Sequence, residues 1–338
     1  MTTSEHKHFN QIPLSVLDLA PVTEGSTPKQ SFENSVELAQ HVEKWGFNRF
    51  WLAEHHNMPG IASSATSVII GHIAGATERI RVGSGGVMLP NHATLVIAEQ
   101  FGTLETIYPD RIDLGLGRAP GSDQPTAYAL RRTLNMRVED FPLQVEELQD
   151  YFADKPDARV RAIPGAGLDI PIWLLGSSGF SAQLSAEKGL PFSFASHFAP
   201  DYTIPALKRY RDNFKPSDKL QKPYAMLGVN IIAADTDEEA EWLSTSQQQQ
   251  FLGIRSGKPT KLKPPVSTLD EEWSALELAS VAKTLNSFST IVGGPKTVKE
   301  KLSRFIEETE ADEVIINTQI FDPKARIRSY EIIADMME

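Results

Sequence analysis

The chain has 338 residues, of which 41% are hydrophobic, and none is cysteine. Its 44 acidic residues outnumber its 33 basic residues, which gives a formal net charge of -11. The apolar fraction is enough for a large folded core, whereas the acidic balance disfavours a nucleic-acid surface or a polybasic membrane patch. Without cysteine, the chain cannot form disulfides, thiolate metal sites, iron–sulfur clusters or a cysteine nucleophile.

The N-terminal residues predict no targeting signal. Residues 1–11 are polar and lack the apolar stretch of a secretory signal peptide. The most apolar window, residues 68–76, is too short to span a bilayer. We therefore expect a cytoplasmic protein with no membrane segment and no nucleic-acid partner.

Short apolar runs alternate with helical patterns along the chain. The apolar runs predict eight strands, at residues 12–19, 49–53, 80–83, 111–115, 171–175, 192–195, 224–233 and 311–317. The helical patterns predict helices at residues 28–45, 63–77, 94–107, 137–152, 180–188, 200–213 and 323–337. This alternation predicts a parallel sheet covered by helices.

The order of elements predicts an α/β fold, a (β/α)8 TIM barrel that forms a single domain over residues 1–338. A doubly wound open sheet is the alternative, but its glycine-rich turn is missing after the first strand. Residues 234–310, between the last two strands, are about twice as long as one βα unit needs. We expect an insertion there, in which residues 253–268, with three prolines and several lysines, form a mobile loop.

Two adjacent histidines follow the second predicted strand. In an extended segment His55 and His56 point in opposite directions, so at most one of them faces the barrel axis. A histidine at a strand end can transfer a proton near neutral pH, or it can form a structural hydrogen bond, here beside Glu54. No metal site is expected, because H-E-x-x-H is absent and the other histidines are scattered.

Glycines follow the third and fourth predicted strands. Gly85 and Gly86 indicate either a kink or a wall where a flat group lies against the backbone. After the fourth strand, Gly117 precedes Arg118, which can bind an anion or form a surface ion pair. The small residues around Arg118 favour the anion site.

A Gly-Ser-Ser-Gly turn follows the fifth predicted strand. Its residues are Gly176, Ser177, Ser178 and Gly179. They offer backbone N–H groups and two hydroxyls at the start of a helix that continues with Phe180, which suits a phosphate, although an ordinary serine N-cap would look the same. Combined with Arg118 and a nearby histidine, the turn fits flavin mononucleotide (FMN), which has a phosphate tail and a flat ring.

Two other strand ends carry polar residues. Asp18 ends the first strand and His197 follows the sixth, and each can line a substrate pocket or serve a structural role. The glutamine run at residues 247–250 predicts a solvated helix face.

Five segments together form a pattern typical of one family. They are FWLAEHH at residues 50–56, VGSGGVMLP at 82–90, AEQ at 98–100, RIDLGLGR at 111–118 and GSSG at 176–179. In this order they resemble the bacterial luciferase-like flavin monooxygenases, in the single-chain, non-luminescent branch. The resemblance implies a (β/α)8 barrel with an insertion after the seventh strand.

The resemblance also implies roles for residues around the flavin ring. His55 matches a histidine that transfers protons beside the flavin. Gly85 and Gly86 match a non-prolyl cis peptide under the isoalloxazine ring. Luciferase itself has a cysteine where this chain has Gly117, which puts light emission in doubt.

A second set of residues matches the phosphate site of the family. The set is Arg118, Ser177, Ser178, Phe180 and the Gly179 backbone. A second phosphate arginine is usual, and Arg131, Arg132 and Arg137 are open alternatives for it.

The resemblance therefore implies an enzyme, a flavin-dependent monooxygenase. Reduced FMN, supplied by a separate reductase, would react with O2 to give a flavin hydroperoxide that oxygenates a small organic substrate, with His55 as general acid or base. The alternatives are a deazaflavin-dependent hydride-transfer oxidoreductase on the same barrel and a non-catalytic flavin-binding protein. A homodimer packed through the helices of the second and third units is also implied.

Overall fold

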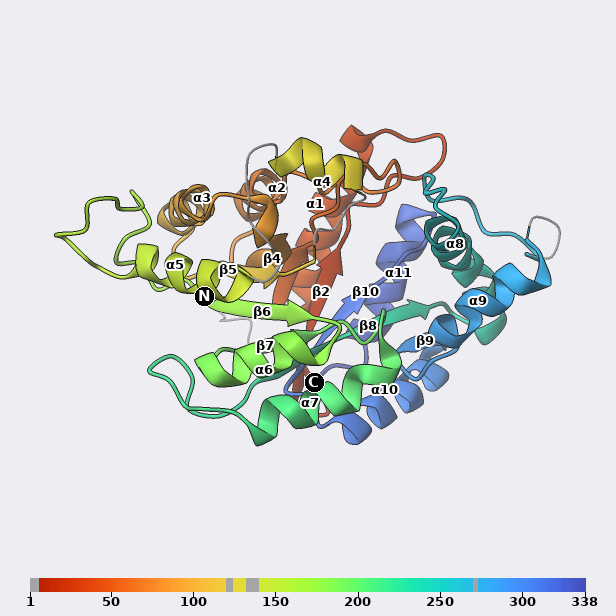
Figure 1. Cartoon of the computed structure of the whole chain (residues 1–338). Coiled ribbons are helices and arrows are strands. Elements are labelled where there is room, and N and C mark those ends of the chain that lie inside the picture. The colour runs from red at the N-terminus through yellow and green to blue at the C-terminus, as the bar shows by residue number, and fades with distance from the viewer. Residues whose placement is uncertain (1–5, 120–123, 132–139, 270–272) are drawn as a thin grey trace.

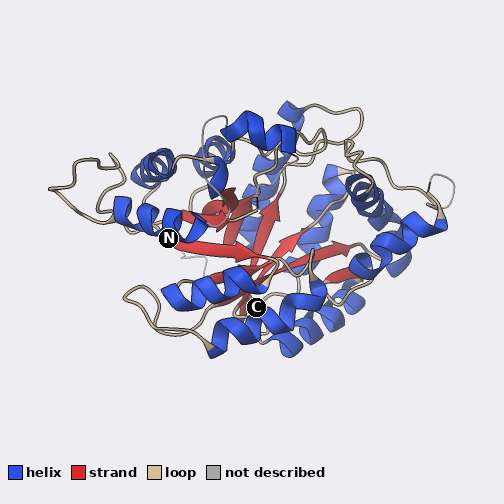
Figure 2. Ribbon diagram, viewed as in Figure 1, coloured by secondary structure: helices blue, strands red, loops and turns tan. Residues whose placement is uncertain are grey.

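A closed barrel of parallel strands forms the centre of the molecule, and helices cover its outside (Figures 1 and 2). The structure, a computed structural model, describes residues 6–119, 124–131, 140–269 and 273–338. The barrel strands are β2 (Ile12–Asp18), β3 (Arg49–Leu52), β4 (Arg81–Met88), β5 (Ile112–Gly117), β6 (Ile172–Gly176), β7 (Phe192–Phe194), β8 (Ala225–Ala233) and β10 (Glu313–Asn317). Hydrogen bonding follows the order β2-β10-β8-β7-β6-β5-β4-β3, and β2 pairs with β3 to close the ring. The predicted (β/α)8 barrel is confirmed.

Two short strands lie outside the ring. β1 (His8–Phe9) pairs antiparallel with β2, and β9 (Thr290–Gly293) pairs parallel with the last four residues of β8. β7 pairs only with the first three residues of β8, so β9 continues the same edge beyond β7. Neither short strand was predicted from the sequence.

Helices follow most barrel strands. They are α1 (Pro28–Trp45), α2 (Thr66–Gly75), α3 (Thr94–Ile107), α4 (Gln124–Arg131), α5 (Phe141–Phe152), α6 (Gly179–Lys188), α7 (Thr203–Asp212), α8 (Asp237–Arg255), α9 (Ala275–Leu285), α10 (Pro295–Thr309) and α11 (Pro323–Ala334). The first shows how local sequence fixes the bounds: the Thr27 hydroxyl accepts a hydrogen bond from the Gln30 N–H, and Gly46 ends α1 with φ of 91°. None of the helices in the described ranges has the length and apolar character that a bilayer crossing needs.

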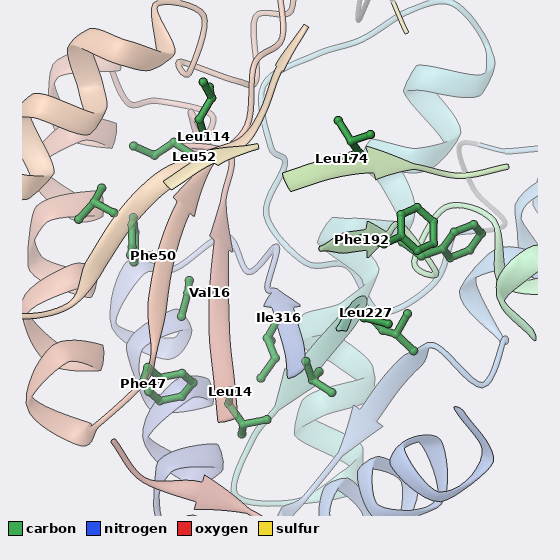
Figure 3. Close-up of a cluster of buried hydrophobic side chains, with 14 of the residues drawn as sticks. Leu14, Val16, Phe47, Phe50, Leu52, Leu114, Leu174, Phe192, Leu227 and Ile316 are labelled. Carbon is green, nitrogen blue, oxygen red and sulfur yellow. The ribbon is translucent and has the colours of Figure 1, made fainter. Parts of the chain in front are cut away.

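Side chains of the barrel strands divide between two apolar clusters, because successive residues face opposite sides of a strand. Leu14 and Val16 belong to the larger cluster, which fills the space between the strands and the surrounding helices (Figure 3). Leu17 and Trp51 belong to a smaller cluster with Met226. The strands are therefore buried on both faces, as in other parallel barrels.

Charged side chains at the strand starts fill the N-terminal end of the barrel. Arg49 places Nη1 2.6 Å from Asp113 Oδ2 and Nε 3.0 Å from Glu313 Oε1, and Arg81 contacts the other Asp113 oxygen at 2.7 Å. The Arg49 guanidinium also lies 4.9 Å from the centre of the Trp173 ring. Because these charges are paired, the barrel can bury them, and the opposite end is left for a binding site.

The region 234–310 contains α8, α9, β9 and α10. The predicted loop at residues 253–268 begins too early, because α8 continues to Arg255. The remainder passes back over the barrel, where Leu262 is fully buried and exchanges backbone hydrogen bonds with Val22 and Glu24. We still propose a single domain, and the mobility of the loop stays a prediction.

The glutamine run in α8 was wrongly predicted to be a solvated face. Gln247 and Gln249 are only 1% and 4% exposed. The reason is that the segment after α8 folds back on it, so that Gln249 Nε2 donates to the Pro264 carbonyl at 2.9 Å.

Candidate active site

A cavity of about 320 Å³ lies at the C-terminal ends of the barrel strands. Of the residues predicted from the sequence, its lining includes His55, Gly85, Gly86, Gly117, Arg118, Gly176, Ser177, Ser178 and His197. Apolar side chains, among them Leu17, Trp51 and Ile315, line other parts of it. The structure thus brings most of the predicted site residues to one place.

The ends of β4 and β5 form a wall without side chains. The peptide bond between Gly85 and Gly86 is cis, as the family resemblance implies, and the pairing register of β4 with β5 shifts here. A Cβ at Gly86 would lie 2.8 Å from the Gly115 carbonyl oxygen, and one at Gly85 would lie 2.7 Å from Leu17 Cδ1. The Gly115 backbone therefore excludes a side chain at Gly86, whereas a side chain at Gly85 would have to displace the end of Leu17. With glycine at both positions, the wall stays open to a flat ligand.

Met88, the last residue of β4, occupies the space beside Gly117. A Cβ at Gly117 would lie 2.7 Å from Met88 Sδ, and both residues line the cavity. The position that holds a cysteine in luciferase is therefore filled here by a thioether from the neighbouring strand.

The carboxylate of Glu54 fixes the orientation of the histidine pair. It accepts hydrogen bonds from His56 Nε2 at 2.7 Å, His92 Nε2 at 2.8 Å and the Met88 N–H at 2.9 Å. Burial opposes ionisation of Glu54, but these hydrogen bonds lower its pKa to about 2. His56 is thus held away from the cavity, and His55 is the member of the pair that lines it.

His55 is an uncharged imidazole near neutral pH. Burial lowers its pKa to about 4, although the neighbouring Glu54 carboxylate acts in the opposite direction. Its Nδ1 is buried and has no hydrogen-bond partner within the described part of the chain. A neutral imidazole with an unused nitrogen can accept or donate a proton once a ligand enters.

His197 is a second neutral imidazole in the lining. Burial lowers its pKa to about 4, and a positive charge on His55 would lower it further. Its ring lies against Gly228 of β8, and its backbone N–H donates to the Gly228 carbonyl at 3.0 Å. Its Nδ1 also lacks a hydrogen-bond partner among the described residues.

The Gly-Ser-Ser turn connects β6 to the N-terminus of α6. Ser178 is the N-cap of α6 with an extended backbone, but its hydroxyl makes no capping hydrogen bond. The backbone N–H groups of the first helical turn are therefore available to an anion. Gly179 and Phe180 begin the helix just behind the lining, and Arg118 lies with its guanidinium carbon 4.0 Å from the centre of the Phe180 ring.

Sequence reasoning missed Ser181. It lines the cavity, is 3% exposed, and lies so close to the turn that a Cβ at Gly176 would be 2.6 Å from Ser181 Cβ. Its position three residues after Ser178 was the available signal, because residues three apart share a helix face.

Of the two roles that the sequence left open for Asp18, the substrate-pocket role is not supported, since Asp18 does not belong to the cavity lining. Its carboxylate is fully buried and accepts hydrogen bonds from Ser35 Oγ at 2.5 Å and the Ala20 N–H at 3.0 Å, and it pairs with Arg326 Nη2 at 2.8 Å. The Asp18 carboxylate is therefore engaged in contacts that stabilise the fold.

The structure does not decide which arginine is the second one at the phosphate site. Arg132 and Arg137 lie outside the described residues, and the Arg131 side chain is not described. Within the described ranges, no group of three or more His, Asp or Glu side chains could hold a metal ion.

The chain belongs to the luciferase-like monooxygenase family, whose model matches residues 12–313. It is 61% identical to YvbT of Bacillus subtilis, with 96% of both chains covered. It is 55% identical to a luciferase-like monooxygenase of Escherichia coli, with 97% of both covered. It is 32% identical to the N-acetyl-S-alkylcysteine monooxygenase of B. subtilis, over 96% of this chain and 98% of the relative.

Solved structures share the barrel. The structure of apo-MsnO8 matches with a TM-score of 0.85 and 33% identity, over 96% of this chain and 98% of MsnO8. Two others are similar in fold alone. The oxygenating constituent of 3,6-diketocamphane monooxygenase from Pseudomonas putida, in complex with FMN, matches with a TM-score of 0.68 and 18% identity over 96% and 97% of the two chains. An F420-dependent secondary alcohol dehydrogenase matches with a TM-score of 0.66 and 14% identity over 97% and 99%.

Proposed function

We propose that this protein is an FMN-dependent monooxygenase that uses O2 to oxygenate a small organic substrate. The observation that carries the proposal is that one cavity joins a Gly-Ser-Ser turn beside Arg118, a glycine wall, and the unprotonated His55. These features suit the phosphate, the flat ring and the proton transfers of a flavin reaction. Membership of the luciferase-like monooxygenase family supports the same class of chemistry.

The groups left without partners fit FMN. The hydroxyls of Ser177 and Ser178 and the first N–H groups of α6 can hold a phosphate, and Arg118 supplies positive charge. The wall at Gly85 and Gly86 has no side chain to obstruct a planar ring. When bound in its reduced form, FMN supplies the electrons that activate O2.

His55 would hold and return the proton. Its low pKa keeps the imidazole neutral at pH 7, so it can accept a proton from a bound reactant and later release it. The apolar side chains of Leu17, Trp51 and Ile315 would exclude water from the reacting groups. His197, on the neighbouring part of the lining, would contact the substrate.

A deazaflavin coenzyme is the second candidate cofactor, because an F420-dependent dehydrogenase has the same barrel. Such an enzyme would transfer hydride to or from its substrate without O2. We favour FMN because the family is named for monooxygenases and because a neighbouring fold binds FMN.

We also propose two partners. A separate reductase would supply reduced FMN, because the sequence has no G-x-G-x-x-G turn of its own for a nicotinamide cofactor. A second copy of the chain would pack on the helices of the second and third units, where α2 exposes 71% of Val68.

Flavin binding and O2 consumption test the proposal. The protein is titrated with FMN and with the deazaflavin coenzyme, then supplied with reduced FMN, O2 and candidate carbonyl, sulfonate or thioether substrates, whose products are analysed by mass spectrometry. We expect tighter binding of FMN and O2 uptake that depends on one substrate class. Tighter deazaflavin binding would favour hydride transfer, and flavin binding without any product or O2 uptake would favour a non-catalytic flavin-binding protein.

A further inference from the structure

The part of the cavity lining that lies across the barrel from the glycine wall carries two polar side chains. Around the closed ring, β8 is four strands from β4 in either direction, and β7 and β10 are its neighbours. His197 follows β7 and Asn317 ends β10, and both residues line the cavity. A flat ligand on the wall at Gly85 and Gly86 therefore has these two side chains on the other side of the cavity.

The amide of Asn317 is held in one orientation by two other amides. Its Nδ2 donates to Asn230 Oδ1 at 2.9 Å, and its Oδ1 accepts from Gln319 Nε2 at 2.9 Å. Asn230 and Gln319 are themselves buried, so solvent does not compete for these hydrogen bonds. An amide nitrogen carries two hydrogens, and the described residues supply an acceptor for one of them. Asn317 therefore keeps a fixed N–H for a ligand.

The imidazole of His197 occupies the space that a side chain at residue 228 would fill. A Cβ at Gly228 would lie 2.7 Å from His197 Cε1 and nearer still to Nδ1. The His197 side chain is only 4% exposed, and its Nδ1 has no hydrogen-bond partner among the described residues. A buried polar atom without a partner is costly unless a ligand supplies one. Gly228 thus makes room for an imidazole that can still form a hydrogen bond.

Neither of these two side chains brings a charge to this part of the cavity. The amide of Asn317 does not ionise, and burial lowers the pKa of His197 to about 4, so its imidazole is neutral near pH 7. Among the described lining residues, the permanent charge is that of Arg118, which lies beside Phe180 of α6. An anion buried against His197 and Asn317 would lack a counter-charge, which is unfavourable.

We propose that His197 and Asn317 determine substrate specificity by donating hydrogen bonds to an uncharged carbonyl oxygen of the substrate. This rests on the proposed function. A carbonyl oxygen has two lone pairs and can accept from the Asn317 N–H and the His197 N–H together. A thioether sulfur is a weak acceptor, and a sulfonate carries a negative charge. Of the three candidate classes, the pair therefore selects the carbonyl compound.

The experiment uses three compounds built on similar rings: cyclohexanone, the cyclic thioether tetrahydrothiopyran, and cyclohexanesulfonate. kcat/KM is measured for each with reduced FMN and O2, and binding of each compound to the protein is measured by ligand-detected NMR. The wild type is compared with three variants. His197→Phe keeps a ring over Gly228 without nitrogen, His197→Gln keeps an N–H donor, and Asn317→Asp keeps the shape of the side chain without its N–H groups.

We expect the wild type to prefer cyclohexanone over both other compounds by about tenfold in kcat/KM. His197→Phe and Asn317→Asp should raise the KM for cyclohexanone about tenfold, and His197→Gln should retain most of the preference. Unchanged kinetics with tetrahydrothiopyran in the variants would show that the fold and the flavin reaction are intact.

Equal kcat/KM for the ketone and the thioether in the wild type, or a ketone preference that persists in His197→Phe, would overturn the inference. If Asn317→Asp does not fold, the two His197 variants decide. If no compound is oxygenated, the proposed function fails, and NMR then tests the inference separately. Tighter binding of cyclohexanone than of cyclohexanesulfonate, lost in His197→Phe, would support it, whereas equal binding or no binding would overturn it.

Discussion

The stability of the fold at acid pH should depend on His197. Its side chain is 4% exposed, and burial lowers its pKa from 6.5 to about 4. Between these values the unfolded chain binds a proton that the folded state excludes, so the contribution to stability is complete above pH 6.5 and is lost as the pH falls toward 4. The full loss is about 3 kcal/mol, since one unit of pKa shift corresponds to about 1.4 kcal/mol.

The contribution of His197 to the unfolding free energy is measured by urea unfolding of the wild type and of His197→Gln, whose side chain cannot be protonated. Between about pH 7.5 and about pH 5, the wild type should lose about 2 kcal/mol more unfolding free energy than the variant. His72→Gln, at an exposed position on α2, should lose as much as the wild type. Equal losses in the wild type and in His197→Gln would refute the reasoning, because the imidazole would then titrate alike in both states.

Three further predictions concern single side chains. Asp18→Asn should lower the unfolding free energy in urea by about 3 to 5 kcal/mol, because it leaves the buried Arg326 without its counter-charge; a loss no larger than that of an exposed pair would contradict this. Gly117→Cys should weaken FMN binding about tenfold, because the new side chain displaces the Met88 thioether. Adding Met88→Ala should restore part of the FMN affinity. Equal weakening in the double variant would exclude the clash with Met88 as the cause. His55→Ala should retain FMN binding and lower the rate of substrate oxidation by about 100-fold or more, and an unchanged rate would remove its role in proton transfer.

Elements with local end signals could be predicted from the sequence to within a few residues. α1 and α3 have the predicted bounds, because a threonine cap and a left-handed glycine delimit α1 and a Tyr-Pro-Asp turn follows α3. β4 is longer than predicted, since its glycines hide the strand pattern although the backbone continues to Met88. β9 could not be predicted, because its place is determined by the edge of β8 that β7 leaves unpaired.

The site could be predicted where its residues follow strand ends, because all barrel strands deliver their C-terminal residues to one side. Asp18 also follows this rule, but the sequence could not decide between its pocket-lining and structural roles, since its partner Arg326 lies 308 residues away in the chain.

The paired charges around Arg49 restrict the route by which molecules can enter and leave the cavity. They close the N-terminal end, and above them Trp173 contacts Trp51 and Tyr224 edge to face, with ring centres 5.3 and 5.6 Å apart. Molecules that reach the cavity must therefore enter and leave through the mouth at the opposite end. In a cavity with one opening, a molecule bound near the opening would block exchange of one bound more deeply. If the proposed function is right, product release and flavin exchange use the same opening.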